Sequence, residues 1–420
     1  MLSHGRFVSN LSGTSMLEIA ALSFLFPAFL LLCKCYQVHL KADANKGART
    51  CCLWSLFVEF TFIVIPTLSI LTVLNGKVYP LTAVLVCGLV LAFFMKRRQV
   101  EAAQISNKDE KLLRLQFLSS YRFVVMLVTC LTILAVDFKI FPRRYAKTET
   151  YGTGLMDVGV GSFVVVNAVV SRKARGLSIL KGKSRVLQNT GPLLLLGFAR
   201  LLFTKQADYQ VHVGEYGVHW NFFFTLAAVA LLTNIINIPA HLSGIFGASI
   251  LFVYQLCLLG GLNSYLNTTQ RGASLINQNK EGIFSLVGYW GLYLLGVQLG
   301  YLFFQSRKSK SGLLTPLGVA GIWALAFLFW SLTVLFDRFL ERTSRRSCNV
   351  AYASFILAVN LEGLGVLASL EVFPNIQLLL LEKIITENLL ATFLLANVLT
   401  GLVNLSVNTI FVSASAAYGL

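Results

Sequence analysis

Long runs of apolar residues, separated by short polar segments, fill almost the whole chain. An α-helix needs roughly 20 such residues to cross the hydrocarbon core of a bilayer. The strands of a membrane barrel give shorter segments in which apolar and polar residues alternate. The pattern therefore predicts an all-α, polytopic transmembrane helix bundle. We expect about twelve spans, the sixth of them short, near residues 17–36, 51–74, 78–95, 119–137, 155–171, 190–204, 217–238, 242–261, 282–304, 312–336, 350–372 and 387–413.

The composition agrees with this pattern. Mean hydropathy is +0.72, and only 13% of the residues are charged, whereas soluble domains carry about 25%. The polar segments have the length of loops, so we expect one membrane-embedded domain over residues 1–420. The polar N-terminus predicts no cleavable signal peptide. The eight cysteines form neither a metal-ligand series nor a disulfide framework, and no metal site is predicted.

The formal net charge is +17, but the basic residues are spread over many loops, so we do not predict nucleic-acid binding. In membrane proteins, lysine and arginine concentrate in the cytoplasmic loops. A lumenal N-terminus places 21 of these residues in the cytoplasm and 13 in the lumen. It also places the sequons at Asn10 and Asn267 on the side where glycosylation occurs. We therefore expect a multi-pass glycoprotein with a lumenal N-terminus.

Two lumenal loops break the charge rule. Residues 138–154 and 337–349 together hold eight lysines and arginines. A compact basic loop on this side predicts an anionic ligand, because pairs such as Arg143–Arg144 and Arg345–Arg346 can bind phosphate bidentately, while Lys147 supplies a mobile point charge. The alternative is that these cations are neutralised by nearby acids, namely Glu149, Asp157, Asp337 and Glu341.

The first of these loops also carries acidic and aromatic residues between two apolar runs. Asp137 and Asp157 lie where the flanking helices meet the loop. Ionisable groups at this depth usually face a cavity or a partner, so both are candidate site residues. Glu149 and Tyr151 lie between them and join the candidate substrate-binding residues.

A second candidate cluster lies at the start of a later helix, in the segment 215–225. Its tryptophan and tyrosine are typical of the membrane interface. His219 and Asn221 are suited to donate hydrogen bonds to a sugar hydroxyl or a carbonyl, and His219 is also a candidate base. A histidine satisfied by its interfacial surroundings is the alternative interpretation.

Several chemistries lack their motifs in this sequence. It contains no phosphate-binding P-loop, no metal-ligand cluster, no Gly-x-Ser-x-Gly elbow and no His-x-x-x-Asp acyltransferase box. What remains is a carboxylate and an ammonium about ten residues apart in one loop. Such a pair can deprotonate a hydroxyl as it attacks an activated acyl group and can stabilise the developing oxyanion.

Four blocks of the chain carry a family resemblance: residues 7–14, 133–161, 215–225 and 397–404. In these blocks the chain resembles the PIG-W type of glycosylphosphatidylinositol (GPI) inositol-acyltransferase, from near its first residue to near its last. The second and third blocks, which include the loop with Asp137 and Lys147 and the segment with His219 and Asn221, are long enough to be specific.

The resemblance implies an O-acyltransferase of GPI-anchor biosynthesis. Members move an acyl chain, usually palmitoyl, from acyl-CoA to an inositol hydroxyl of glucosaminyl-phosphatidylinositol on the lumenal side of the endoplasmic reticulum membrane. These two lipids and the bilayer are then the expected partners, with palmitoyl-CoA as co-substrate and no bound cofactor. The family's catalytic aspartate and lysine fall on Asp137 and Lys147, with Asp157 as the rival base. Phosphate binding would fall to Arg143, Arg144, Arg345 and Arg346.

The family usually continues into one more transmembrane segment, a thirteenth, whereas this chain ends at Leu420. We therefore expect the last span of the family pattern to be missing. An alternative function from another class is a transporter or flippase for an anionic lipid that uses the basic lumenal loops as its vestibule. Paired half-repeats with broken helices would favour transport, and the sequence shows none.

Overall fold

The computed structural model of the chain describes residues 11–43, 48–100, 116–177, 183–206, 213–305, 316–369 and 378–419. Within these ranges every regular element is a helix, apart from isolated bridges that Gly13 and Thr14 make with Thr153. The helices are α2 (Met16–Asp43), α3 (Ala48–Glu59), α4 (Ile65–Leu71), α5 (Val78–Val100), α7 (Gln116–Ala135), α8 (Leu155–Val169), α9 (Lys183–Gln206), α10 (Val213–Tyr216), α11 (Phe222–Ile235), α12 (Ser243–Cys257), α13 (Asn263–Asn267), α14 (Leu275–Gln278), α15 (Lys280–Gln305), α16 (Pro316–Phe339), α17 (Val350–Ala368), α18 (Leu380–Glu387), α19 (Leu389–Ser406) and α20 (Ala414–Gly419).

These helices confirm the predicted fold class. In the described part of the chain, eight segments are long and apolar enough to cross a membrane: Met16–Gln37, Cys52–Leu71, Gln116–Ala135, Ala240–Asn267, Lys280–Phe304, Gly318–Phe339, Val350–Ala368 and Leu389–Ser406. Four shorter apolar helices, Asn75–Leu91, Leu155–Val169, Thr190–Leu202 and Phe222–Ile235, coincide with the remaining predicted spans. The chain is therefore an all-α polytopic membrane protein.

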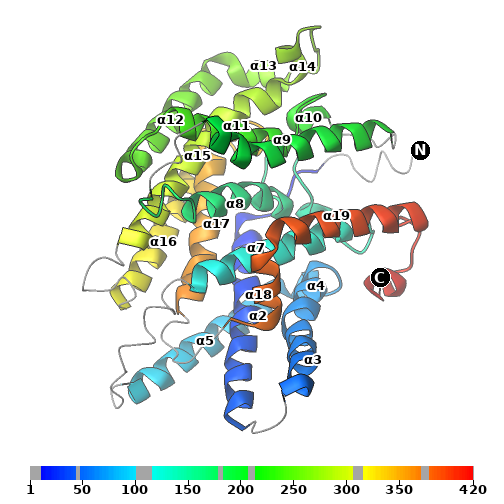
Figure 1. Cartoon of the computed structure of the whole chain (residues 1–420), viewed down its shortest axis with the longest axis vertical. Coiled ribbons are helices and arrows are strands. Elements are labelled where there is room, and N and C mark those ends of the chain that lie inside the picture. The colour runs from blue at the N-terminus through cyan, green and yellow to red at the C-terminus, as the bar shows by residue number, and fades with distance from the viewer. Residues whose placement is uncertain are drawn as a thin grey trace.

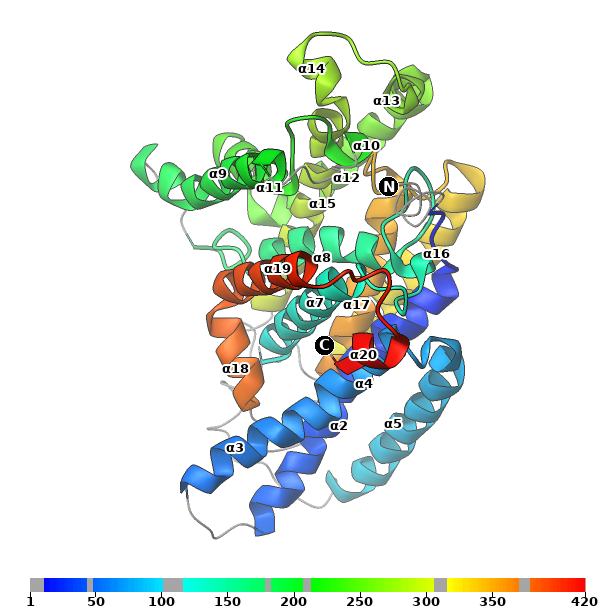
Figure 2. The same cartoon turned by 90° about the vertical axis from the view of Figure 1, so that its right-hand side faces the viewer.

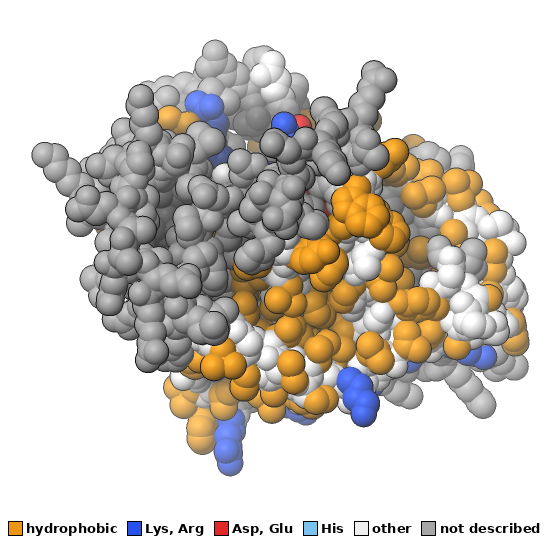
Figure 3. All heavy atoms as spheres, turned by 90° about the horizontal axis from the view of Figure 1, so that it is seen from below, with side chains coloured by type: hydrophobic (Ala, Val, Ile, Leu, Met, Phe, Trp, Pro, Cys, Tyr) orange, Lys and Arg blue, Asp and Glu red, His pale blue; other side chains and the backbone are white. Residues whose placement is uncertain are grey.

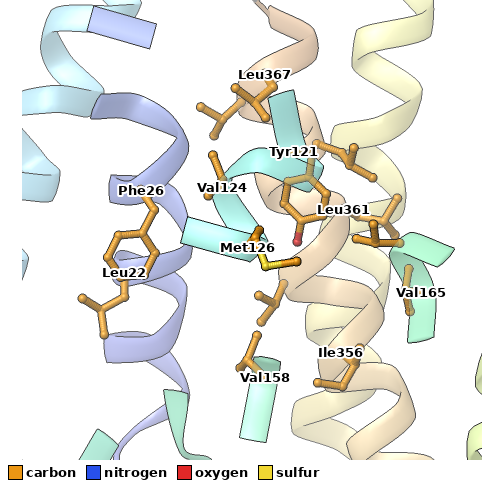
Figure 4. Packing of buried hydrophobic residues seen from close by; sticks show 14 of the residues in the cluster. Leu22, Phe26, Tyr121, Val124, Met126, Val158, Val165, Ile356, Leu361 and Leu367 are labelled. Atoms are coloured by element: carbon orange, nitrogen blue, oxygen red, sulfur yellow. The ribbon is translucent and has the colours of Figure 1, made fainter. Parts of the chain in front are cut away.

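Helix α17 lies at the centre of the bundle (Figure 1). Every residue from Ala351 to Ala368 is buried, because α2, α7, α8 and α16 all pack around it. Small residues allow this close approach, as is usual between membrane helices. A Cβ atom at Gly161 of α8 would lie 2.4 Å from the Ile356 side chain. Figure 4 shows the apolar side chains that α2, α7, α8 and α17 contribute to this core.

The outer helices present apolar surface to their surroundings. Only 17% of the α16 span and 6% of the α19 span are buried within the protein, against 89% of the α17 span. Exposed leucines, such as Leu405 of α19 at 86% exposure, would be costly in water but are at no disadvantage against lipid tails. Figure 3 views the molecule from below, and most of the described side chains visible there are hydrophobic. This surface fits a protein surrounded by bilayer.

Buried polar groups in the bundle bond to one another, as hydrocarbon surroundings require. Lys34 of α2 forms an ion pair with Glu382 of α18, with 2.9 Å between its Nζ and Oε2, and also donates to Ser120 of α7. Glu59 accepts hydrogen bonds from the backbone N–H groups of Leu380 and Leu381. Helix α18 is therefore held at its N-terminal end, and it leads directly into α19.

The connections on one side of the bundle form the surroundings of the candidate site. They include α10, the short helices α13 and α14, and residues 136–154, which join α7 to α8 (Figures 1 and 2). Of the two predicted sequons, Asn10 lies outside the described residues, while Asn267 is the exposed last residue of α13. We call residues 136–154 the site loop.

Candidate functional site

The site loop is fixed by two segments that are distant in sequence. The backbone N–H of Thr14 donates to the carbonyl of Thr153 at 2.7 Å, and the Thr153 hydroxyl donates back to the carbonyl of Thr14 at 2.6 Å. On the other side, the N–H of Gly152 donates to the carbonyl of Thr343 at 2.8 Å. Gly152 has a φ of 124°, and a Cβ there would lie 2.1 Å from the Ser12 carbonyl oxygen. Only glycine fits this crossing.

Asp157 organises the end of the site loop where α8 begins. Its side chain is 1% exposed and accepts hydrogen bonds from the N–H groups of Gly154 and Thr148 and from the Thr148 hydroxyl. The guanidinium of Arg345 adds an ion pair of 2.6 Å to the same carboxylate. A carboxylate near a helix N-terminus is electrostatically favoured. These partners occupy both oxygens of Asp157.

Lys147 lies in an ionic cluster that connects the site loop to α10. Its ammonium is 3.2 Å from Glu215 Oε1, and Arg345 lies 3.6 Å from the same oxygen. Burial of Lys147 lowers the pKa of its ammonium, and Glu215 partly offsets that effect. Burial opposes ionisation of Glu215, but Lys147 and Arg345 outweigh it and lower the pKa of its carboxyl to about 2.

Two features of this cluster favour an anionic group. Arg345 is only 2% exposed, yet its Nη1 atom has no hydrogen-bond partner in the described structure. Arg200 of α9 also acts electrostatically on Lys147 and Glu215. Among the described residues, two cations, Arg345 and Arg200, and one carboxylate, Glu215, act on the Lys147 ammonium. The Lys147 side chain keeps 32% of its surface accessible.

Asp137 lies at the other end of the site loop, where α7 ends. It is partly exposed, and its Oδ2 accepts a hydrogen bond of 2.8 Å from Nδ2 of Asn404 in α19. Arg143 interacts with it electrostatically. The structure therefore gives Asp137 and Lys147 different neighbours, from α19 and from α10. Asp137 is the more accessible of the two predicted aspartates.

The arginine pair of the site loop has contacts within the protein. Arg144 donates to Glu18 Oε1 of α2 at 3.0 Å and to the Asn75 side chain at 2.9 Å. Arg143 donates to the carbonyl of Val136 and lies over the Phe141 ring. Arg144 thus fastens the loop to the first turn of α2. The ion pair of Arg144 is of the kind that the sequence offered as the alternative, but its acid is Glu18, which was not among those suggested.

The remaining candidates of the two basic loops, residues 138–154 and 337–349, also contact the protein. Arg346 donates to Glu281 Oε1 and to the carbonyl of Leu266, both at 2.8 Å. The Tyr151 hydroxyl donates to Glu341 and accepts from Asn263 of the segment that begins α13. Glu149 is exposed, and its backbone N–H donates to the carbonyl of Leu11.

His219 and Asn221 lie in the segment that joins α10 to α11. Asn221 is 5% exposed and caps α11, accepting from the N–H groups of Phe223 and Phe224. His219 has an exposed side chain, while its backbone N–H donates to Asn279. The capping contacts give Asn221 a structural role, and His219 keeps an open ring.

Sequence reasoning missed two residues with direct contacts to the predicted pair. Glu215 bonds to Lys147 and Asn404 bonds to Asp137. Both fall within blocks that carry the family resemblance, at positions 215–225 and 397–404. Their positions in those blocks were the available signal, but only the fold reveals their partners.

Comparison with known proteins identifies the chain's relatives. A model of the GWT1 family matches residues 2–420. The chain belongs to the GWT1 family. An uncharacterised Arabidopsis thaliana protein is 50% identical to this GWT1-family chain over 359 positions, which cover 86% of the chain and 82% of that protein.

Two further relatives of the GWT1-family chain have functional names. The Bos taurus glucosaminyl-phosphatidylinositol-acyltransferase PIGW is 34% identical over 475 aligned positions, covering 96% of the chain and 91% of that protein. GPI-anchored wall transfer protein 1 of Aspergillus oryzae is 34% identical over 473 aligned positions, which cover 98% of the chain and 92% of that protein.

These relatives confirm the resemblance predicted from the sequence. The GWT1-family chain is an acyltransferase with a role in GPI-anchor biosynthesis. They favour an enzyme over the alternative of a lipid transporter. The site loop, its ionic cluster and Asp137 are therefore interpreted as parts of an acyl-transfer site.

Proposed function

We propose that the protein transfers an acyl chain, palmitoyl in the expected case, from acyl-CoA to an inositol hydroxyl of glucosaminyl-phosphatidylinositol. The observation that carries the proposal is the 34% identity to a named glucosaminyl-phosphatidylinositol-acyltransferase over 96% of the chain. We place the reaction in the endoplasmic reticulum membrane, with the N-terminus and the site loop on the lumenal side. The partition of basic residues among the loops supports this orientation.

Asp137 acts as the general base in this proposal. Its carboxylate takes the proton of the inositol hydroxyl as the oxygen attacks the thioester carbonyl. The attack forms the C–O bond and a tetrahedral oxyanion, whose collapse breaks the C–S bond and leaves the ester, and the proton passes from Asp137 to the departing CoA thiolate. The accessibility of Asp137 supports this role. Asp157 is a poorer candidate, because Thr148, Gly154 and Arg345 already occupy its oxygens.

Lys147 stabilises negative charge in this proposal. An ammonium fixed beside Arg345 and Arg200 favours the oxyanion that forms on the thioester carbonyl, and such stabilisation is often a large part of catalysis. The unpartnered Nη1 atom of Arg345 is suited to a phosphate or carbonyl oxygen of a substrate. Glu215 keeps Lys147 in place when no substrate is present.

Acyl transfer in membranes that carry single variants tests the proposal. Asp137→Asn and Lys147→Ala should each lower transfer by about 100-fold or more, the range expected when a general base or an oxyanion donor is removed. Lys139→Ala is the matched control, because Lys139 is exposed in the same loop and lies over the Phe411 ring. Its turnover should stay near the wild-type value.

Asp157→Asn separates the rival bases. We expect this variant to lose folded protein, since it removes the nearer of the two carboxylates that pair with buried Arg345. Asp137→Asn should leave folded protein at the wild-type level. Normal turnover by well-folded Asp137→Asn would end the assignment of the base. The absence of transfer to glucosaminyl-phosphatidylinositol by the wild-type protein would overturn the proposed substrate.

A further inference from the structure

The carboxylate of Glu341, just after α16, has partners of a different kind from those of Asp157, Glu215 and Glu281. Each of those three forms an ion pair with an arginine or a lysine. The sequence suggested that Glu341 also neutralises nearby cations, but among the described residues no lysine or arginine forms an ion pair with it. Its hydrogen-bond donors are neutral side chains, and it is partly exposed. The negative charge of Glu341 is therefore left without a cation.

Three side chains from three parts of the fold hold the Glu341 carboxylate in place. The amide of Asn263, where α13 begins, and the hydroxyl of Tyr151, in the site loop, donate to Oε1 at 2.6 and 3.3 Å. The amide of Gln255 in α12 donates to Oε2 at 2.5 Å. Gln255 is itself held, because its side-chain oxygen accepts from the backbone N–H of Val350 at 3.0 Å. The carboxylate is thus pre-organised before any ligand binds.

These hydrogen bonds leave Glu341 able to accept a cation. The two oxygens of a carboxylate offer about four acceptor positions, and the three donors occupy only part of them. Asp157 shows that a carboxylate with several hydrogen bonds still pairs with a cation, because Arg345 lies 2.6 Å from it. Glu341 differs from Asp157 in being partly exposed, so its cation can come from a ligand.

Glu341 lies close to the cationic part of the candidate site. The segment that contains it runs beside the site loop, where the Ser344 hydroxyl donates to the carbonyl of Thr150 at 2.6 Å. Arg345, which belongs to the ionic cluster, follows Glu341 by four residues, so their Cα atoms are at most about 14 Å apart. One part of the site is therefore positive, and a neighbouring part carries a single fixed negative charge.

We propose that Glu341 binds the ammonium group of the glucosamine ring in the acceptor lipid. This inference rests on the proposed function, because it takes glucosaminyl-phosphatidylinositol as the acceptor. That lipid has a phosphate on its inositol ring and an amine on its glucosamine ring, and pairing with a carboxylate keeps the amine protonated. The cations around Arg345 face the phosphate, while Glu341 receives the ammonium. Opposite charges that match those of the headgroup fix its register and so orient the inositol hydroxyl.

This contact makes Glu341 a specificity-determining residue, which acts on binding and not on the reacting atoms. Acetylation of the amine removes its charge and would leave the carboxylate without its partner, which a site built for a polar contact rejects. Dimethylation of the amine adds comparable bulk but keeps the positive charge and one N–H donor. The protein should therefore distinguish these two modified acceptors by charge and not by size.

Acyl transfer to three acceptors tests the inference: the free amine, its N,N-dimethyl form and its N-acetyl form. In the wild-type protein, kcat/KM should be about tenfold or more higher for the two charged acceptors than for the N-acetyl form. Glu341→Gln should lower kcat/KM for the charged acceptors by about tenfold, the value of one charge-assisted hydrogen bond, and leave the N-acetyl value unchanged.

Asp337→Asn is the matched control. It also removes one negative charge, from the last turn of α16, but its side-chain oxygen can still accept from the N–H and the hydroxyl of Thr343. This variant should keep the wild-type order of the three acceptors. Equal losses on all three acceptors in Glu341→Gln would make its role structural and overturn the inference. If Glu341→Gln does not fold, the wild-type comparison decides, because equal turnover of the dimethyl and acetyl acceptors would also overturn it.

Binding without turnover separates this inference from the proposed function. Native mass spectrometry of Asp137→Asn measures retention of the free-amine and N-acetyl lipids even if the protein transfers no acyl chain. We expect about tenfold preference for the free amine, and adding Glu341→Gln should abolish it. An unchanged preference in the double variant would overturn the inference. Phosphatidylethanolamine carries the same ammonium group, so it is added as a competitor; displacement of the free-amine lipid would assign Glu341 to a bilayer lipid and not to the acceptor.

Discussion

At the scale of single residues, the candidate site is built from charges that hold one another in place. Glu215 balances Lys147 and Arg345, and Asp157 balances Arg345 from the other side. Because the folded state lowers the pKa of Glu215 to about 2, its contribution to stability is present above the ordinary pKa of 4.5. That contribution is lost as the pH falls toward about 2.

Replacing Glu215 should change the pH dependence of turnover. Glu215 raises the pKa of Lys147, which burial lowers. In Glu215→Gln the ammonium therefore deprotonates at a lower pH. We expect the alkaline limb of the kcat/KM profile to move to lower pH, with activity partly recovered in more acidic buffer. Glu387→Gln, at an exposed position far along the chain, should leave the profile unmoved. If the alkaline limb does not shift in Glu215→Gln, deprotonation of Lys147 is not what sets that limb.

Asn404 should act through Asp137. Its side-chain amide donates to the Asp137 carboxylate at 2.8 Å, so Asn404→Ala should let that carboxylate rotate away from the hydroxyl. We expect kcat to fall by about five- to tenfold, the value of one hydrogen bond, with little change in KM for either substrate. Asn397→Ala is the control, since the bond that Asn397 makes in the described structure lies within α19, to the carbonyl of Phe393. Equal losses in the two variants would indicate a general effect on α19.

The residues of the site were partly predictable. Asp137 and Lys147 stand out as ionisable groups beside long apolar runs. Their partners do not, because Glu215 and Asn404 are distant in sequence and each is an ordinary polar residue in its own segment. The predicted phosphate-binding role for Arg144 took no account of Glu18, which forms an ion pair with this arginine while its side chain stays 37% exposed. Pairing of charges across such distances depends on the fold, which residue type and spacing do not specify.

At the scale of elements, apolar length was sufficient to find the helices. Each of the twelve predicted spans contains an apolar helix in the structure. The short helices α10, α13 and α14 escaped prediction, because four or five residues carry no periodic signal. The same is true of the backbone bonds that fix the site loop to Thr14 and Thr343, since any peptide group can make them.

Among the helices, α18 has the anchoring contact whose loss should be most visible in the free energy of unfolding. Glu382 is fully buried and receives Lys34 and Ser120. Glu382→Gln leaves a buried ammonium unpaired, which should lower the free energy of unfolding by about 3–5 kcal/mol. Thermal unfolding of the purified protein measures this loss. Lys383→Gln, at the exposed neighbouring position, should have almost no effect. A Glu382→Gln protein as stable as Lys383→Gln would show that the ion pair contributes little.

At the scale of the whole molecule, the fold determines which segments share one side of the membrane. Asn263, where α13 begins, donates to the hydroxyl of Tyr151 in the site loop at 2.6 Å. The sequon at Asn267 therefore lies on the same side as the site loop. A glycan at Asn267 would report the side on which the candidate site opens.

Expression in cells with glycosylation-site mapping tests this orientation. We expect the wild-type protein to carry a glycan at Asn267, whose side chain is exposed, and to shift to lower mass on endoglycosidase treatment. Asn267→Gln should abolish the part of the shift that this sequon contributes. A sequon placed at position 172, in the turn after α8, should stay unmodified. Modification there would place the site loop in the cytosol.

The clamp on the site loop, formed by its backbone bonds to Thr14 and Thr343, also constrains the order in which the protein can be assembled. One half of it, around Thr14, leaves the ribosome early, while the other, around Thr343, is made only after α16 has been synthesised. Asp137 and Lys147 are thus translated long before the segment that locks their loop exists. A nascent chain halted within α16 has both predicted catalytic residues but lacks the Thr343 contact, so we expect no activity before that segment has been made.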